Sequence, residues 1–149
     1  MRILHPTDFS ACADRAEAET IRLAHAIGGE VILLHVAVEA PLYGEGLLNM
    51  SGVKQVYEAE RKWATATLEE RVARIREHGL AARWLFRTGA PHEEIVKVAR
   101  EERVDLIVMG THGRGGLERF LLGSVADRVI RTAPCSVLTV RETQDEGGR

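Results

Sequence analysis

Residues 106–116 read Leu-Ile-Val-Met-Gly-Thr-His-Gly-Arg-Gly-Gly, and residues 122–131 read Leu-Gly-Ser-Val-Ala-Asp-Arg-Val-Ile-Arg. The apolar run at 106–109 predicts a strand buried on both faces, and residues 125–131 predict a helix opened by Ser124. Glycines fill the connection and let the backbone come close to a ligand. Free N–H groups in such a loop and at a helix start form an anion-binding concavity. This junction therefore predicts a phosphate site.

The spacing within this junction is Gly110-x2-Gly113-x9-Gly123-Ser124. It differs from a Walker A loop, because no lysine precedes the serine and the glycine spacing does not fit. It also differs from the dinucleotide fingerprint, whose third glycine is missing. A different kind of phosphate loop is therefore indicated. The alternative is a plain tight connection, in which Ser124 and Asp127 form an ordinary capping pair at the helix start.

Length and composition limit the class of protein. The chain has 149 residues, of which 45% are hydrophobic and 28% are charged, and its formal net charge is −2. These values are typical of one soluble domain, and no stretch approaches the ~20 apolar residues of a membrane span. The charge balance argues against nucleic acid as a partner. The first residues run directly into an expected strand and leave no room for a signal peptide, which favours the cytoplasm.

Neither cysteine nor histidine is grouped in a way that indicates a metal or redox site. Cys12 and Cys135 lie far apart without CxxC spacing and are expected to be reduced. The histidines outside the junction fall on separate elements, and we expect structural or surface roles for His5, His25, His35, His78 and His92. No Ser/His/Asp or Cys/His triad can be assembled from adjacent elements, so no catalytic residue is assigned.

Apolar runs alternate with amphipathic segments along the chain. Strands are expected at 2–6, 31–36, 81–87, 106–109 and 135–140, and helices at 11–27, 53–75, from 91 and at 125–131. Residues 37–52 are expected to form a long loop of the kind that often serves as a lid or contact surface, and residues 142–149 a loose tail. Residues 1–141 are thus expected to form one three-layer α/β domain, a parallel sheet with helices on both faces. Ligands of such sheets bind at the carboxyl ends of the strands, where the winding reverses.

Two side chains near the expected strand ends are candidates for contact with a ligand. Asp8 follows the first strand and can accept hydrogen bonds from a ribose hydroxyl or a base amine. It can equally cap the first helix, a role that Ser10 can also fill. Val36 ends the second strand and offers an apolar wall beside a base, although a valine in that position is usually part of the core.

Two side chains of the glycine loop carry chemistry of their own. Arg114 can hold a fixed positive charge near phosphate oxygens, or it can be a solvated surface arginine. His112 can hydrogen-bond a phosphate or a ribose and can act as a general base near neutral pH. A plain loop histidine that points toward water is the alternative.

These residues together resemble the universal stress protein family, and specifically its ATP-binding subgroup. The resemblance spans nearly the whole chain and rests on residues 6–10, 33–36, 89–91 and 109–125. It implies a five-stranded parallel sheet with strand order 3-2-1-4-5 and four main helices, an arrangement like that of the adenine nucleotide alpha-hydrolases. It also implies homodimers in which the last strand, Ser136–Val140, pairs with its twin, since an uncovered apolar edge strand otherwise invites uncontrolled pairing.

The resemblance implies a nucleotide site as well. Its ligand would be ATP, with AMP or ADP as alternatives, and a Mg²⁺ or Mn²⁺ ion would bridge the phosphate oxygens. The implied adenosine contacts are Pro6, Thr7, Asp8 and Val36, and Met109 and Gly110 would lie along the nucleotide. The implied ribose and phosphate contacts are His112, Gly113, Gly123, Ser124 and Val125. Arg114, singled out above for its charge, is a further candidate near the phosphates.

A phosphate loop without an evident catalytic apparatus favours a binding protein over an enzyme. We expect a cytoplasmic, dimeric stress-response or signalling module whose shape or partners change with nucleotide state, with the 37–52 loop as the moving part. The alternative is a slow ATPase or a phosphoryl or adenylyl transferase, in which Asp8 or His112 orients the attacking group. A third possibility is an interaction module that holds the nucleotide only as a structural filler.

Overall fold

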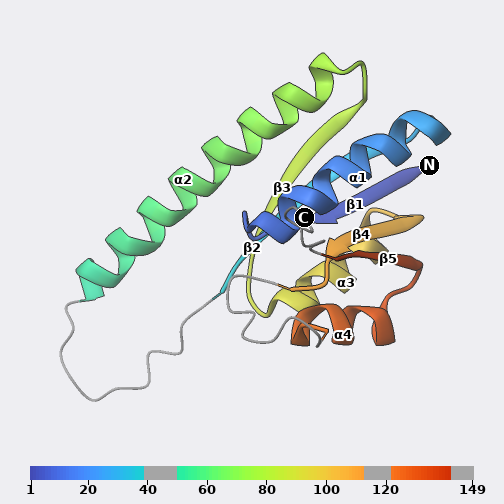
Figure 1. The fold of residues 1–149 in the computed structure, drawn as a ribbon. Coiled ribbons are helices and arrows are strands. Elements are labelled where there is room, and N and C mark those ends of the chain that lie inside the picture. The colour runs from blue at the N-terminus through green and yellow to red at the C-terminus, as the bar shows by residue number, and fades with distance from the viewer. Residues whose placement is uncertain (39–49, 113–121, 142–149) are drawn as a thin grey trace, which may run out of the picture.

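The structure is a computed structural model that describes residues 1–38, 50–112 and 122–141, with the backbone alone at residues 50 and 51. Strands and helices alternate along the chain (Figure 1). In order they are β1 (Arg2–Pro6), α1 (Ala11–Ile27), β2 (Glu30–Ala37), α2 (Met50–Glu77), β3 (Ala82–Thr88), α3 (Pro91–Glu101), β4 (Leu106–Gly110), α4 (Ser124–Thr132) and β5 (Ser136–Val140).

The strands form one parallel sheet with the order β3-β2-β1-β4-β5, which confirms the expected topology. β1 lies in the middle, where Leu4 pairs with Ile32 of β2 on one side and with Ile107 of β4 on the other. The chain winds outward in one direction to β3 and in the other direction to β5. The reversal therefore falls between β1 and β4, and a ligand crevice is expected at the carboxyl ends of these two strands.

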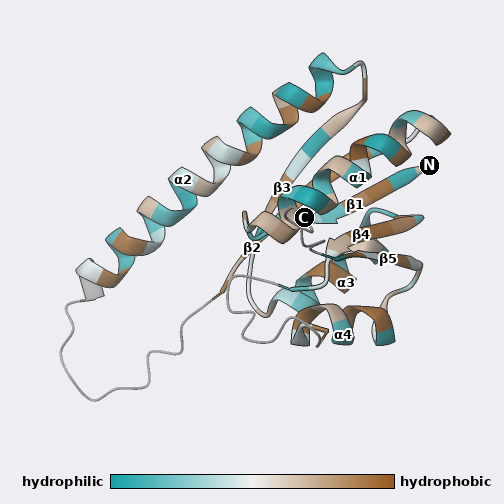
Figure 2. Cartoon of the chain, viewed as in Figure 1, coloured by the Kyte–Doolittle hydropathy of each residue, from teal (hydrophilic) through white to brown (hydrophobic). Residues whose placement is uncertain are grey.

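Alternate residues of the strands build two separate cores, one on each face of the sheet. Ile3 points into the layer beneath α1 and α2, whereas Leu4 points into the layer beneath α3 and α4. Both side chains are fully buried. Figure 2 shows the apolar colouring concentrated in the strands, while polar and apolar residues alternate along the helices. This two-sided burial explains why the central strands read as continuous apolar runs.

The boundaries of the second helix differ from the expectation. The helix begins at Met50 rather than at residue 53, and Ala37 belongs to β2. Gly52, expected at the end of the loop, lies inside the helix, which tolerates a glycine at a cost of about 1 kcal/mol relative to alanine. The rest of that predicted loop, residues 39–49, and the predicted tail, 142–149, lie outside the described residues.

The first strand carries a fully buried histidine, His5, whose Nδ1 atom lies 2.9 Å from the carbonyl oxygen of Val108. Burial lowers the pKa of His5 below its ordinary value of 6.5, because the charged ring would lose its water. The neutral ring donates from Nδ1 to Val108, and its Nε2 atom has no partner among the described residues. Protonation would place an unpaired N–H and a charge in the core.

We therefore expect the free energy of unfolding to fall as the pH drops below about 6.5. In that range the unfolded chain binds a proton at His5 that the folded chain does not, which adds a slope of up to about 1.4 kcal/mol per pH unit. Urea unfolding from about pH 7 to about pH 5 measures this slope. His5→Asn, which keeps an N–H for Val108, should remove it, and His25→Asn on the exposed end of α1 should not. Equal slopes in all three proteins would contradict the assignment.

Candidate functional site

A cavity of about 560 Å³ opens at the carboxyl ends of β1 and β4, where the winding of the sheet reverses. This volume is in the range of small-molecule sites. Ten of the twelve candidate residues line it: Pro6, Thr7, Asp8, Val36, Met109, Gly110, His112, Gly123, Ser124 and Val125. The other two, Gly113 and Arg114, lie outside the described residues.

The corner after β1 is held by its own hydrogen bonds. The backbone N–H of Thr7 donates to the carbonyl of Leu34 at 2.8 Å, and the Thr7 hydroxyl accepts from the N–H of Phe9 at 3.1 Å. Asp8 Oδ1 accepts from the N–H of Ser10 at 3.0 Å. These bonds fold the chain sharply enough that Phe9 adopts a φ of 61°. The corner thus presents Asp8 to the cavity.

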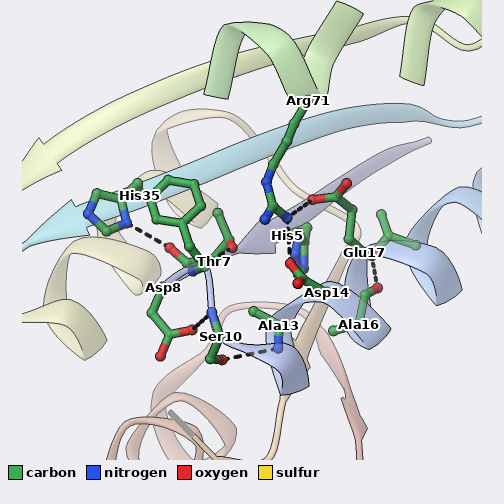
Figure 3. Close-up of polar contacts among 12 residues, drawn as sticks. His5, Thr7, Asp8, Ser10, Ala13, Asp14, Ala16, Glu17, His35 and Arg71 are labelled. Atoms are coloured by element: carbon green, nitrogen blue, oxygen red, sulfur yellow. Dashed lines mark hydrogen bonds and ion pairs between the residues drawn. The ribbon is translucent and has the colours of Figure 1, made fainter. Parts of the chain in front are cut away.

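The two candidate caps of the first helix have separate roles. Ser10 is the N-cap of α1, and its hydroxyl accepts from the N–H of Ala13 at 3.2 Å (Figure 3). Asp8 does not cap the helix; its Oδ1 closes the turn that leads to Ser10. The Asp8 carboxylate therefore stabilises the turn after β1 and also lines the cavity.

Behind this corner lies a histidine that sequence reasoning left among the structural or surface residues. His35 is 8% exposed, and its Nδ1 atom lies 2.8 Å from the carbonyl oxygen of Thr7. The Phe9 ring stacks on the His35 ring with centroids 4.7 Å apart. Figure 3 shows His35 and Arg71 approaching the corner from β2 and α2. Side chains of β2 and α2 thus pack against the corner that carries Thr7 and Phe9.

The described glycines of the loop have reasons within the fold. A Cβ on Gly123 would lie 2.8 Å from the carbonyl oxygen of Thr111, to which the Gly123 N–H donates at 2.7 Å. A Cβ on Gly110 would lie 2.8 Å from Sγ of Cys12. Gly123 therefore brings the start of α4 against the end of β4, and Gly110 lets α1 pack on β4. Both close approaches shape the cavity wall.

The start of α4 differs by one residue from the expected capping pair. Gly123 is the N-cap, with no side-chain cap, and Ser124 is the first helical residue. Asp127 is paired with Arg131 at 3.1 Å instead of with Ser124. The N–H groups of a first helical turn have no acceptor within the helix. Ser124, Val125 and Ala126 all line the cavity, so this end of it is electropositive.

His112 lies beside this helix start. Its Nδ1 atom is 2.8 Å from the hydroxyl oxygen of Thr111, a contact that orients the ring. Its Nε2 atom is buried and has no hydrogen-bond partner in the described part of the chain. A buried polar atom without a partner is costly, and a ligand oxygen would satisfy it. The ring therefore offers a hydrogen bond to whatever occupies this end of the cavity.

Sequence reasoning missed several residues that line the cavity, among them Thr111, His35 and Glu60. Thr111 and His35 neighbour candidate residues, and their position at the strand ends was an available signal. Glu60 comes from α2, far from the other lining residues in the sequence. Nothing in the sequence distinguishes its carboxylate from those on the exposed faces of helices.

The described ranges contain neither a cluster of metal ligands nor a membrane-spanning helix. Across residues 1–38, 50–112 and 122–141, no three His, Cys, Asp or Glu side chains come together as a metal site. Within those ranges, no helix is long and apolar enough to cross a membrane.

The fold and cavity define a doubly wound α/β domain with a ligand pocket at its switch point. The family model of the universal stress protein family matches residues 1–141, and the chain belongs to this family. Universal stress protein MJ0577 of Methanocaldococcus jannaschii is 37% identical over 152 residues, which cover 94% of each chain. The solved structure of MJ0577 gives a TM-score of 0.77, with 97% of each chain covered.

Two further solved structures share the fold. UspA of Lactobacillus plantarum has a TM-score of 0.83 at 24% identity, with 95% of this chain and 97% of that one covered. A universal stress protein in complex with cAMP has a TM-score of 0.67 at 25% identity, with 96% and 98% covered. That relative is thus an adenine nucleotide binder on the same architecture.

Proposed function

We propose that this protein binds ATP in the cavity at the β1–β4 switch point and works as a nucleotide-dependent stress-response module. One observation carries the proposal: three features line one cavity. They are the first turn of α4, the His112 Nε2 atom, which has no hydrogen-bond partner among the described residues, and an apolar wall at Val36. The first two features suit phosphate oxygens, and the third suits a base. The relative in complex with cAMP supports an adenine nucleotide as the ligand class.

The strand order gives the proposed ligand a direction. Phosphates belong at the β4–α4 end, where Gly123 and Ser124 begin the helix. β1 lies next, and its corner presents Asp8 to the ribose. β2 lies farther along on the other side of β1 and brings Val36 to the base. A Mg²⁺ or Mn²⁺ ion would neutralise charge by binding the phosphate oxygens.

We further propose that the protein is a cytoplasmic homodimer joined through β5. The strand lies at the edge of the sheet, and Leu138 on it is 36% exposed. Unpaired N–H and C=O groups along an apolar edge strand favour pairing with a second strand. A second copy would continue the sheet across the dimer.

The direct test is a titration calorimetry measurement of ATP binding, with a native mass spectrum of protein purified without added nucleotide. Binding of ATP and a mass increment of a retained adenine nucleotide are the expected results. Heat changes no larger than dilution, with ATP, ADP and AMP alike, would refute the proposal.

His112→Ala is expected to weaken ATP binding about tenfold and to leave adenosine binding unchanged, because it removes one hydrogen bond to a charged phosphate. Calorimetric titration of both ligands measures the difference. His78→Ala, at the exposed C-terminal side of α2, is the matched control and should bind like the wild type. An equal loss for ATP and adenosine would place His112 away from the phosphates.

A further inference from the structure

α2 contributes an acidic side chain, Glu60, to the lining of the cavity. This helix covers the face of the sheet on which α1 also packs. Ala64 and Leu68 lie one and two turns further along the helix and are fully buried against the sheet. Residues four apart share a helix face, so Glu60 lies on the same face of α2 as these two residues, at a position that is exposed. Figure 1 shows the N-terminal half of α2 extending beyond the carboxyl edge of the sheet. Glu60 belongs to this half of the helix and lines the cavity.

Within the described part of the chain, the Glu60 carboxylate forms no hydrogen bond or ion pair. Glu58, two residues earlier, points to a different side of the helix and pairs with Lys54 at 3.8 Å. Glu58 does not line the cavity. Glu58 thus forms an ion pair on the surface of α2, whereas Glu60 lines the cavity and can contact a ligand there.

The packing of α2 against β2 and β3 places Glu60 on the β2 side of the cavity. Val38 and His35, at the end of β2, line the cavity with it. β2 and β4 lie on opposite sides of β1. A nucleotide with its phosphates at Gly123 and its ribose at Asp8 thus extends its base toward β2 and α2.

We infer that Glu60 is a specificity-determining residue, whose carboxylate accepts a hydrogen bond from the 6-amino group of adenine. The inference rests on the proposed nucleotide function and deepens it. An ionised carboxylate only accepts hydrogen bonds, and the amino group is a donor at the edge of the purine. The apolar faces of the ring would pack against Val36 and Val38, which carry no donor or acceptor in their side chains. The edge contact then distinguishes a purine with the amino group from one without it.

The test is a double-mutant cycle between the protein and the ligand. ATP and purine riboside triphosphate, which lacks only the 6-amino group, are titrated in the presence of Mg²⁺ against the wild type, Glu60→Ala and the control Glu58→Ala. The wild type and Glu58→Ala are expected to prefer ATP about tenfold, the size of one hydrogen bond to a charged group. For Glu60→Ala the two affinities should agree within about twofold.

The outcomes separate this inference from the function on which it rests. A preference for ATP that survives in Glu60→Ala, or a loss of affinity that is equal for both nucleotides, overturns the inference and leaves the nucleotide site in place. Failure of the wild type to bind ATP overturns the proposed function, and the inference with it. Thermal unfolding of Glu60→Ala should match that of Glu58→Ala, since both positions are exposed on the same helix.

Discussion

Gly123→Ala is expected to weaken ATP binding by about 100-fold. The added Cβ would lie 2.8 Å from the carbonyl oxygen of Thr111, a main-chain atom at the end of β4 that cannot rotate away. The backbone angles of Gly123, φ −60° and ψ 149°, suit alanine, so the effect comes from the contact alone. To relieve it, the start of α4 must move away from β4.

That movement would lower both the affinity for ATP and the stability of the fold. It would stretch the 2.7 Å bond from the Gly123 N–H to Thr111 and displace the free N–H groups of Ser124 and Val125. A misplacement of about 1 Å at such a site costs on the order of 100-fold, or about 2.7 kcal/mol, and overpacking costs a similar amount of stability, about 1–3 kcal/mol. Calorimetric titration with ATP and urea unfolding measure the two effects.

Gly52→Ala is the matched control for this substitution. Gly52 lies in α2 with open space where its Cβ would be, so alanine should raise the helix propensity and leave ATP binding unchanged. An affinity of Gly123→Ala within about threefold of the wild type would show that the α4 start does not hold the phosphates.

Much of the fold was predictable because the sheet is buried on both faces. The continuous apolar run that ends at Met109 is what such a strand requires, and helices that cover both faces enforce the alternation along the chain. The one-residue error at the start of α4 has a physical cause. Gly123 and Ser124 are both acceptable N-caps, and the close contact with Thr111, which excludes a side chain at the cap, appears only in three dimensions.

The support of the site was not predictable in the same way. His35 and Glu60 are ordinary residues in the sequence, and their roles depend on which strand and helix lie next to β1. The sequence does not show whether Asp8 or Ser10 caps the first helix, whereas the structure shows that Ser10 is the N-cap and that Asp8 accepts a hydrogen bond from its N–H. A sequence motif such as the glycine loop reflects the local backbone geometry, whereas contacts between distant segments depend on the topology of the fold.

Arg71→Met is expected to lower the free energy of unfolding by about 3 kcal/mol and the Tm by about 10 °C. The Arg71 side chain is only 13% exposed, and its Nη1 atom bonds Asp14 at 2.7 Å and Glu17 at 2.8 Å. Methionine of similar length would leave two neighbouring carboxylates without their cation. Of the two, Glu17 is as buried as Arg71, so water cannot fully replace the lost partner.

Arg22→Met is the control, because Arg22 pairs with Glu19 on the exposed surface of α1 with 68% of its side chain exposed. Surface pairs of this kind contribute about 0–1 kcal/mol. The double variant Arg71→Met with Glu17→Gln removes the stranded buried charge and should recover part of the loss. If Arg71→Met costs no more than Arg22→Met in urea unfolding, the bridge between α1 and α2 does not stabilise the fold.

The same arginine connects stability to the proposed site. Its guanidinium lies 5.3 Å from the centre of the Phe9 ring, and Phe9 in turn stacks on His35, which holds the carbonyl of Thr7. Loss of the cation therefore loosens the support of the corner that presents Asp8 to the cavity. ATP affinity of Arg71→Met, measured well below its Tm, should fall several-fold because the corner must be ordered on binding. An unchanged affinity would show that the hydrogen bonds of the corner hold it without help from α2.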